Sequence, residues 1–146
     1  MSPPRHPDPR VHDVIAFFER LTPADLPRFG ALYAANAQFK DPFNEVVGVP
    51  AIQAIFAHMF NTLDGPRFVV TQAVSEGDQA FLVWDFHFHF KSGGALQTIR
   101  GSSHLRFDDA HRISLHRDYW DAAEELYEKL PVLGALMRWV KRRASR

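Results

Sequence analysis

Residues 79–120, QAFLVWDFHFHFKSGGALQTIRGSSHLRFDDAHRISLHRDYW, decide the fold of this chain. Long runs of alternating apolar and polar residues are interrupted twice, by Ser-Gly-Gly and by Asp-Asp-Ala-His, which are turn-forming sequences. Immediately upstream, Glu76-Gly77-Asp78 predicts a further hairpin turn between two extended segments. Together these signals predict antiparallel strands over residues 67–75, 79–91, 96–107 and 112–120.

Helical spacing dominates the part of the chain before this sheet. Apolar residues recur every three or four positions between Val11 and Leu21, which is the period of one helix face. Thr22-Pro23 then predicts the start of a second helix, closed by Asn36, because Thr is a good N-cap and Pro fits the first turn. A third helix is expected over residues 50–63.

A second helical region follows the sheet. Residues 121–143 show helical spacing with a break at Pro131, whereas residues 1–10 hold four prolines and no apolar cluster. The fold class is predicted to be α+β, with a curved antiparallel sheet wrapped around three N-terminal helices and an extra C-terminal helix. The predicted divisions are a disordered tail over 1–10, one domain over 11–121 and a helical extension over 122–146.

Composition indicates a soluble globular domain and argues against several function classes. Of the 146 residues, 46% are hydrophobic and 23% charged, and 17 basic residues balance 17 acidic ones. Because nucleic-acid binders normally carry a basic excess, we expect no nucleic-acid partner. The absence of cysteine excludes disulfides, thiol catalysis and thiolate metal sites. No apolar run approaches the ~20 residues that cross a bilayer, and no signal core is visible, so a cytoplasmic protein is expected.

The last strand sorts its residues onto two different faces. Alternation predicts Ile113, Leu115, Arg117 and Tyr119 on one side, and Ser114, His116, Asp118 and Trp120 on the other. A face that mixes His, Asp and Trp suits the wall of a pocket, because a buried carboxylate is costly unless it is paired. The alternative is an open sheet face on which Asp118 pairs with Arg117, Arg106 or His116.

The longest strand has an apolar face and a polar face. The apolar face must be covered by helices or by a ligand, and consists of Leu82, Trp84, Phe86, Phe88 and Phe90. The polar face carries His87 and His89 beside Asp85, a weak signal for a divalent metal that equally fits an exposed or subunit-interface face. We therefore expect no metal site. The chain contains no Gly-rich phosphate loop, so no nucleotide cofactor is expected either.

Two further polar residues are candidate functional groups. Asp41 lies beside Phe39, Pro42 and Phe43, an apolar setting of the kind that tunes a buried carboxyl group for general-base work. The alternative is a turn-forming Asp-Pro pair. Ser103 is a candidate hydrogen-bond donor in the pocket, since it lacks the Gly-x-Ser-x-Gly context of a nucleophilic serine.

The order of several short strings along the chain points to a family. They are Asp25-Leu26, Ala31-Leu32-Tyr33-Ala34, Asp41-Pro42-Phe43, Leu105-Arg106-Phe107-Asp108, Arg112-Ile113 and Tyr119-Trp120. In this order they resemble the NTF2-like superfamily, and within it the SnoaL-like and ketosteroid-isomerase-like branch. The resemblance covers about residues 11–121. It implies a cone-shaped roll, in which a curved sheet wraps around helices and encloses an apolar cavity open at one end.

The resemblance assigns a role to Asp41, and it shows that three other functional residues of the isomerases are replaced in this chain. Asp41 falls where the isomerases keep the base that moves a proton between carbons. The place of the catalytic tyrosine is taken by Phe17, that of a supporting tyrosine by Phe56, and that of a protonated aspartate by Ser103. Because phenylalanine cannot donate a hydrogen bond to an enolate oxygen, steroid isomerase activity is not expected.

The resemblance also places Asp118 at a pocket-facing position, beside Trp120. SnoaL-like cyclases and limonene-epoxide-hydrolase-like members carry an acidic residue near this point of the last strands. The hydrolases further need an Arg and an Asp two residues apart on a neighbouring strand. Gly101 and Ser103 stand in those places here, so the hydrolase triad is incomplete.

We predict a small cofactor-independent enzyme that acts on a hydrophobic, ring-containing molecule. Asp41 or Asp118 would move a proton, with His116 tuning or relaying it, in an isomerisation, a cyclisation or an epoxide-hydrolase-like addition of water. The residues expected to bind substrate are Phe17, Phe56, Trp84, Phe86, Ser103 and Trp120. The alternative is a non-catalytic module of the same fold, which binds a lipophilic ligand or dimerises.

Two macromolecular contacts are also predicted. One face of the curved sheet needs a cover, and the family usually pairs there, so a homodimer through the sheet face is expected. The basic sequence Lys141-Arg142-Arg143 complements the dipole of the C-terminal helix and is compatible with a membrane surface or an anionic partner. Packing of that helix on the domain or on a second subunit is the other interpretation.

Overall fold

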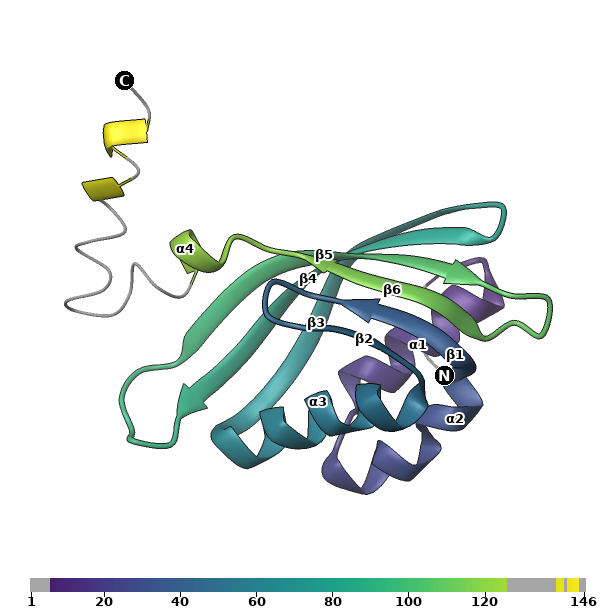
Figure 1. Cartoon of the computed structure of the whole chain (residues 1–146), viewed down its shortest axis with the longest axis horizontal. Coiled ribbons are helices and arrows are strands. Elements are labelled where there is room, and N and C mark those ends of the chain that lie inside the picture. The colour runs from purple at the N-terminus through teal and green to yellow at the C-terminus, as the bar shows by residue number, and fades with distance from the viewer. Residues whose placement is uncertain (1–5, 126–138, 141, 145–146) are drawn as a thin grey trace.

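The chain folds into one curved sheet with helices on its concave side (Figure 1). The structure, a computed structural model, describes residues 6–125, 139–140 and 142–144. Its strands are β1 (Tyr33–Lys40), β2 (Glu45–Val47), β3 (Leu63–Glu76), β4 (Gln79–Phe90), β5 (Gln97–Phe107) and β6 (Ile113–Tyr119). Its helices are α1 (Pro9–Glu19), the 3-10 helix η1 (Pro23–Arg28), α2 (Phe29–Leu32), α3 (Val49–Thr62) and α4 (Ala122–Glu125).

The strands form a single six-stranded sheet in the order β2-β1-β6-β5-β4-β3. All neighbours are antiparallel except β1 and β6, which run parallel. The α+β class and the curved sheet wrapped around helices are confirmed, and the four predicted strands correspond to β3 to β6. The sheet is mixed rather than wholly antiparallel, because the N-terminal strand β1 inserts beside the last strand.

The second predicted helix is shorter than its sequence pattern indicates. Residues 23–32 form η1 and α2, and Tyr33 already begins β1, whereas Asn36 was expected to close a helix. Tyr33 pairs with Ile113, and Phe39 pairs with His116. This segment therefore gains a sheet partner far away in sequence, and such tertiary pairing overrides a local helical preference. The short strand β2 was not predicted, since three residues are too few to show a period.

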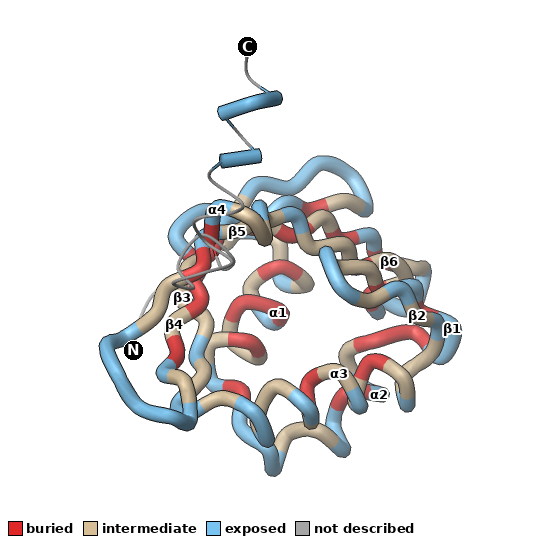
Figure 2. The backbone as a smooth tube through the Cα atoms, turned by 60° about the vertical axis from the view of Figure 1, so that its left-hand side comes forward, coloured by how far each residue is buried: buried red, intermediate tan, exposed pale blue. Residues whose placement is uncertain are grey.

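Buried residues lie both on the helices and on the strands that the helices face (Figure 2). The buried residues of α1 are Val11, Val14, Ile15 and Phe18, and those of α3 are Ile52 and Phe56. They pack against the apolar face of β4, where Leu82, Trp84, Phe86 and Phe88 are buried. The predicted apolar face of this strand is thereby confirmed, and helices cover it.

A β-bulge changes which residues of β6 face inward. The register between β5 and β6 shifts between Arg106 and Phe107, so that Phe107 pairs with Ile113 and Arg106 with Leu115. The extra residue, Ser114, lets both Ile113 and His116 be buried although they are three positions apart. The predicted placement of Ile113 on the face opposite His116 is therefore wrong, whereas His116 and Asp118 share a face as predicted.

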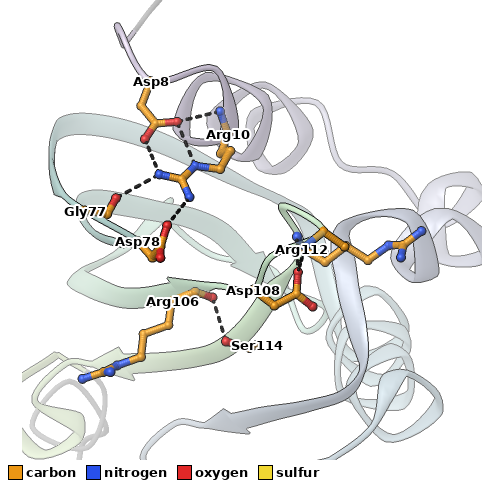
Figure 3. A network of polar contacts seen from close by, with 9 residues as sticks. Asp8, Arg10, Gly77, Asp78, Arg106, Asp108, Arg112 and Ser114 are labelled. Carbon is orange, nitrogen blue, oxygen red and sulfur yellow. Dashed lines mark hydrogen bonds and ion pairs between the residues drawn. The ribbon is translucent and has the colours of Figure 1, made fainter.

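The N-terminal helix is joined to the distant β3–β4 turn by one arginine (Figure 3). α1 begins at Pro9, before the boundary at residue 10 where the predicted tail ends, and Asp8 caps it by accepting from the Arg10 backbone N–H. The Arg10 guanidinium donates to Asp8, to Asp78 Oδ1 at 2.7 Å and to the Gly77 carbonyl at 2.9 Å. The hydrogen bonds that the Asp8 carboxylate accepts from Arg10 hold the pKa of Asp8 below its usual value.

The C-terminal extension is described only in part. α4 covers Ala122–Glu125, and residues 139–140 and 142–144 are helical. Glu125 is buried and accepts from Arg100 of β5 at 2.6 and 2.9 Å. The rest of the predicted extension over 122–146, including the break at Pro131, lies outside the described residues, as does Lys141 of the basic cluster. Among the described residues, no helix is long and apolar enough to cross a membrane.

Candidate functional site

Asp118 lies near the end of β6 and has two hydrogen-bond partners in the described part of the chain. Ser103 Oγ on the neighbouring strand β5 donates to Asp118 Oδ1 at 2.5 Å, and His116 Nε2 lies 2.7 Å from the same oxygen. Both contacts converge on Oδ1, and neither uses Oδ2. The carboxylate is therefore fixed by one oxygen, while 15% of the side chain stays accessible.

His116 continues this network into the interior. Its Nδ1 atom lies 2.7 Å from the hydroxyl of Tyr33, which is the first residue of β1 and is fully buried. The imidazole is enclosed by aromatic rings, with the Phe39 and Phe18 centroids 4.8 and 5.8 Å away. Burial, and after it the negative charge of Asp118, raises the pKa of the Tyr33 hydroxyl well above its ordinary value.

Trp84 of β4 completes the network at its other end. Its indole N–H donates to Ser103 Oγ at 2.9 Å, and Ser103 in turn donates to Asp118. The indole ring lies over Gly101 of β5, where an added Cβ would come within 2.4 Å of the ring. Gly101 therefore provides the space that lets Trp84 reach Ser103.

Two cavities that share part of their lining lie beside Asp118. The inner one has a volume of about 30 Å³, which is enough for about one water molecule, and Phe18, Leu82 and His116 are among its lining residues. The outer one has a volume of about 310 Å³ and an aromatic lining with polar residues. The residues that line both cavities are Phe56, Phe68, Trp84 and Asp118. Asp118 is thus the carboxylate common to both spaces.

Asp41 and Asn44 of the turn after β1 contribute polar groups to the lining of the outer cavity. Asp41 Oδ1 accepts from the backbone N–H groups of Phe43 and Asn44 at 2.8 and 2.7 Å, and from the Asn44 side-chain amide at 3.1 Å. Asp41 Oδ2 accepts from the same amide at 3.2 Å. The carboxylate therefore stabilises the turn after β1, as the turn-forming interpretation expects, while it also lines the outer cavity.

The predicted substrate-binding residues do not all come together. Phe56, Trp84, Phe86 and Trp120 line the outer cavity, and Ser103 lines the inner one. Phe17 lines neither cavity; it lies on another side of α1, with Arg28 over its ring at 5.8 Å. Its neighbour Phe18 lines the inner cavity instead, because consecutive helical residues point about 100° apart.

Tyr33 and Phe68 are site residues that the sequence pattern does not single out. Tyr33 reaches His116 only because β1 lies beside β6, 83 positions along the chain. The one available signal is composition, since Tyr33 is one of only 3 tyrosines among many phenylalanines. Phe68 enters the cavity from β3 and stacks on Phe86 with centroids 4.6 Å apart.

The paired histidines of β4 lie away from the cavities and make other contacts. His87 Nδ1 lies 2.8 Å from Thr98 Oγ1, and His89 Nδ1 lies 3.2 Å from the Gly94 carbonyl oxygen. Within the part of the chain that the structure describes, no group of three or more His, Asp or Glu side chains is arranged to hold a metal ion.

Comparison with known proteins identifies the family. The sequence profile of the SnoaL-like domain matches residues 14–116, which is more than half of the chain. The chain belongs to the SnoaL-like domain family. The match runs from within α1 to within β6; it includes Ser103 and His116 and ends before Asp118. A comparison with curated protein sequences found no match.

Solved structures of SnoaL-like and related proteins share the fold. A Catenulispora acidiphila protein with a ketosteroid isomerase-like fold, solved with trimethylamine, has a TM-score of 0.70 at 20% identity, covering 82% of this chain and 90% of its own. A candidate SnoaL-like polyketide cyclase from Shewanella putrefaciens has a TM-score of 0.66 at 16% identity, covering 80% and 95%. An LEH-like epoxide hydrolase from M. tuberculosis has a TM-score of 0.66 at 18% identity, covering 80% and 85%.

These findings confirm the predicted resemblance to SnoaL-like and ketosteroid-isomerase-like proteins, and the NTF2-like roll. Among these structures are proteins named as a SnoaL-like polyketide cyclase and an LEH-like epoxide hydrolase, and those names describe those proteins. At sequence identities of 16–20%, these structures establish the fold of the chain but not the reaction that it catalyses.

Proposed function

We propose that this SnoaL-like protein catalyses proton transfer on a hydrophobic, ring-containing small molecule, with Asp118 as the general base. The observation that carries the proposal is the arrangement of the Asp118 carboxylate. Oδ1 is held by Ser103 and His116, whereas Oδ2 makes no hydrogen bond to the described residues. A carboxylate held by one oxygen at an aromatic cavity has the geometry that a general base needs.

The proposed reaction begins when Asp118 Oδ2 takes a proton from a carbon next to a carbonyl group of the substrate. The electron pair of the broken C–H bond moves into the carbonyl group and forms an enolate. In an isomerisation, the proton returns from Asp118 to a different carbon. In a cyclisation, the enolate carbon attacks a second carbonyl carbon of the same molecule, and Asp118 returns the proton to the new alkoxide oxygen. The aromatic walls, including Phe56 and Phe68, would hold the rings of the substrate.

Exchange of carbon-bound hydrogen provides a test that does not require the natural substrate. Bicyclic ketones such as 1-tetralone would be incubated with the protein in D₂O, and deuterium entry next to the carbonyl followed by NMR. We expect Asp118→Asn to slow exchange by about 10²- to 10⁴-fold, because general-base catalysis contributes that much. Asp85→Asn is the matched control, because Asp85 lies opposite Arg100 in the β4–β5 register, on the sheet face away from the cavities. The exchange rate of this variant should stay within about twofold of the wild-type rate.

The same assay decides between the two predicted carboxylates. Asp41→Asn keeps an acceptor for the turn amides and removes the negative charge, so the fold should be retained. Loss of exchange in the Asp41 variant with full exchange in the Asp118 variant would assign the base to Asp41 and overturn the present assignment. Full exchange in the double Asp41→Asn/Asp118→Asn variant would exclude catalysis by these carboxylates.

The second candidate function is a non-catalytic module that binds a lipophilic ligand. The hydrogen bonds within the protein favour it. No buried side-chain N or O atom among the described residues lacks a hydrogen-bond partner, so none is left waiting for a substrate group. Calorimetric titration with the same ketones distinguishes the two functions. Equal affinity for wild type and Asp118→Asn, with no exchange in either, would support the binding module.

Epoxide-hydrolase-like water addition is the third candidate. The inner cavity, with room for about one water molecule beside Asp118, is the observation that supports it. The position of Gly101 argues against it, since any side chain there would collide with the Trp84 indole. An arginine in that place would require Trp84 to move away from Ser103.

We also propose that two copies of the chain pair through the outer face of the sheet. Large apolar side chains on this face are exposed on three strands, namely Val74 of β3, Phe81 and Val83 of β4, and Tyr119 of β6. Phe81 lies opposite Val74 on the neighbouring strand. Ser102 of β5 lies between Val83 and Tyr119 and is the register partner of both. The four residues thus form one continuous outer patch, which a second copy would cover.

A further inference from the structure

Tyr33 belongs to the Asp118 network but takes no part in the proton transfer proposed above. Its side chain is fully buried and lines neither cavity. Its raised pKa means that the hydroxyl keeps its proton throughout the physiological range. A buried hydroxyl that keeps its proton has to donate it to an acceptor, because a buried donor without a partner is costly.

The acceptor follows from the contacts of the hydroxyl. Within the described residues the Tyr33 hydroxyl has one hydrogen-bond partner, His116 Nδ1, at 2.7 Å. Donation to Nδ1 requires a lone pair there, so the proton of the neutral imidazole sits on Nε2. An imidazolium ring would carry a proton on both nitrogens and would leave the Tyr33 proton without an acceptor.

The directions of the remaining hydrogen bonds are then fixed. His116 Nε2–H donates to Asp118 Oδ1 over 2.7 Å. On the other side the Trp84 indole can only donate, so Ser103 accepts from it and donates its own proton to the same Oδ1. Two chains of donors, one starting at Tyr33 and one at Trp84, therefore end on a single carboxylate oxygen.

We propose that Tyr33 is a positioning residue that holds His116 as the Nε2–H tautomer. In this state His116 donates to Oδ1 of Asp118 and leaves Oδ2 directed to the substrate. The consequence for catalysis rests on the proposed function, whereas the tautomer itself can be measured without any substrate. Without Tyr33, His116 Nδ1 would be a buried acceptor with no donor, and the ring would lose the contact that fixes its protonation.

Long-range ¹H–¹⁵N correlation spectra of protein labelled with ¹⁵N-histidine test the proposal. The His116 signals are assigned by their loss in His116→Gln. In the wild type we expect the pattern of an Nε2–H imidazole, with an Nδ1 resonance shifted by an accepted hydrogen bond. Tyr33→Phe should move the Nδ1 resonance toward that of a free lone pair or change the tautomer. Tyr119→Phe is the matched control, because Tyr119 is exposed on the same sheet, and it should leave both nitrogens unchanged.

A second substitution keeps the test decisive if Tyr33→Phe does not fold. Replacing Tyr33 by 3-fluorotyrosine preserves the ring and makes the hydroxyl a stronger donor, so the Nδ1 resonance should move in the opposite direction. An Nδ1–H or imidazolium pattern in the wild type would overturn the proposal. So would nitrogen resonances that remain unchanged in the Tyr33 variants.

Kinetics separate this inference from the proposed function. Tyr33→Phe should lower kcat for 1-tetralone exchange by about 10- to 100-fold, the range found for hydrogen-bond partners that orient metal-ligating histidines, and leave KM unchanged. An Nε2–H tautomer in a wild-type protein without exchange activity would refute the proposed function and support the positioning role. Normal kcat in Tyr33→Phe would overturn the catalytic consequence of that role.

Discussion

At the scale of single residues, the site depends on one glycine. A Cβ at Gly101 would lie 2.4 to 2.9 Å from three atoms of the buried Trp84 ring, which has no flexible end that could move aside. We expect Gly101→Ala to lower the free energy of unfolding by about 1–3 kcal/mol, because overpacking displaces the indole from Ser103. Denaturant unfolding measures this, and in a Trp84→Phe background the same substitution should cost less than about 0.5 kcal/mol. Equal costs in the two backgrounds would contradict the predicted clash.

Residue-level prediction from the sequence succeeded where the strand period decides the direction of a side chain. His116 and Asp118 share a face as alternation requires, and Ser103 comes opposite Asp118 on β5. Phe17 was expected in the pocket from the family resemblance, whereas the structure brings Phe18, one position and about 100° away on the same helix, to the inner cavity. Prediction from the sequence could not find Tyr33, since its contact with His116 exists only through the parallel pairing of β1 and β6.

At the scale of elements, the local exceptions to regular structure were invisible in the sequence. The turns around β4 and β5 contain Gly and Asp and were predicted. The bulge at Ser114 was not, because an inserted residue leaves no change in composition. The early end of α2 was also missed, since Tyr33–Lys40 becomes a strand through contacts with β6 rather than through its own residues.

The pairing of β4 with β5 should depend on pH through His104. His104 stacks on Phe81 at 4.5 Å and lies 2.9 Å from Gln79 Oε1. Burial, and after it the charge of Arg106, lowers the pKa of His104 from its ordinary value of 6.5. The folded state therefore binds fewer protons than the unfolded chain, so this contribution to stability is complete above about pH 6.5 and is lost as pH falls through the folded-state pKa.

Melting temperatures between pH 7.5 and about 5 measure this contribution from His104. The Tm of the wild type should fall more steeply with decreasing pH than the Tm of His104→Gln. His89→Gln, at an exposed position of the neighbouring strand β4, should follow the wild-type slope. A His104→Gln protein with an unchanged slope would show that His104 is not linked to stability.

At the scale of the whole molecule, the two faces of the sheet differ in what they contact. The concave face packs against the helices and carries the Asp118 network, and two strands of this network, β4 and β6, also contribute side chains to the exposed outer patch. Val83 and Trp84 are neighbours on β4 and point to opposite faces. A second copy on the outer patch would therefore stiffen the strands that position Trp84 and Ser103, without contributing a residue to the cavity.

This arrangement predicts a dimer that can be separated without damaging the site. Sedimentation should give twice the 16.7 kDa mass of the chain. A Val74→Lys/Val83→Lys protein should sediment as a monomer, because four lysines would meet in a symmetric interface. Leu96→Lys, at an exposed position of the β4–β5 loop, is the matched control and should remain dimeric. Because Val74 and Val83 are exposed, the double variant should keep the wild-type circular dichroism spectrum. A wild type that sediments at 16.7 kDa would refute the pairing, and a dimeric double variant would place the interface elsewhere on the molecule.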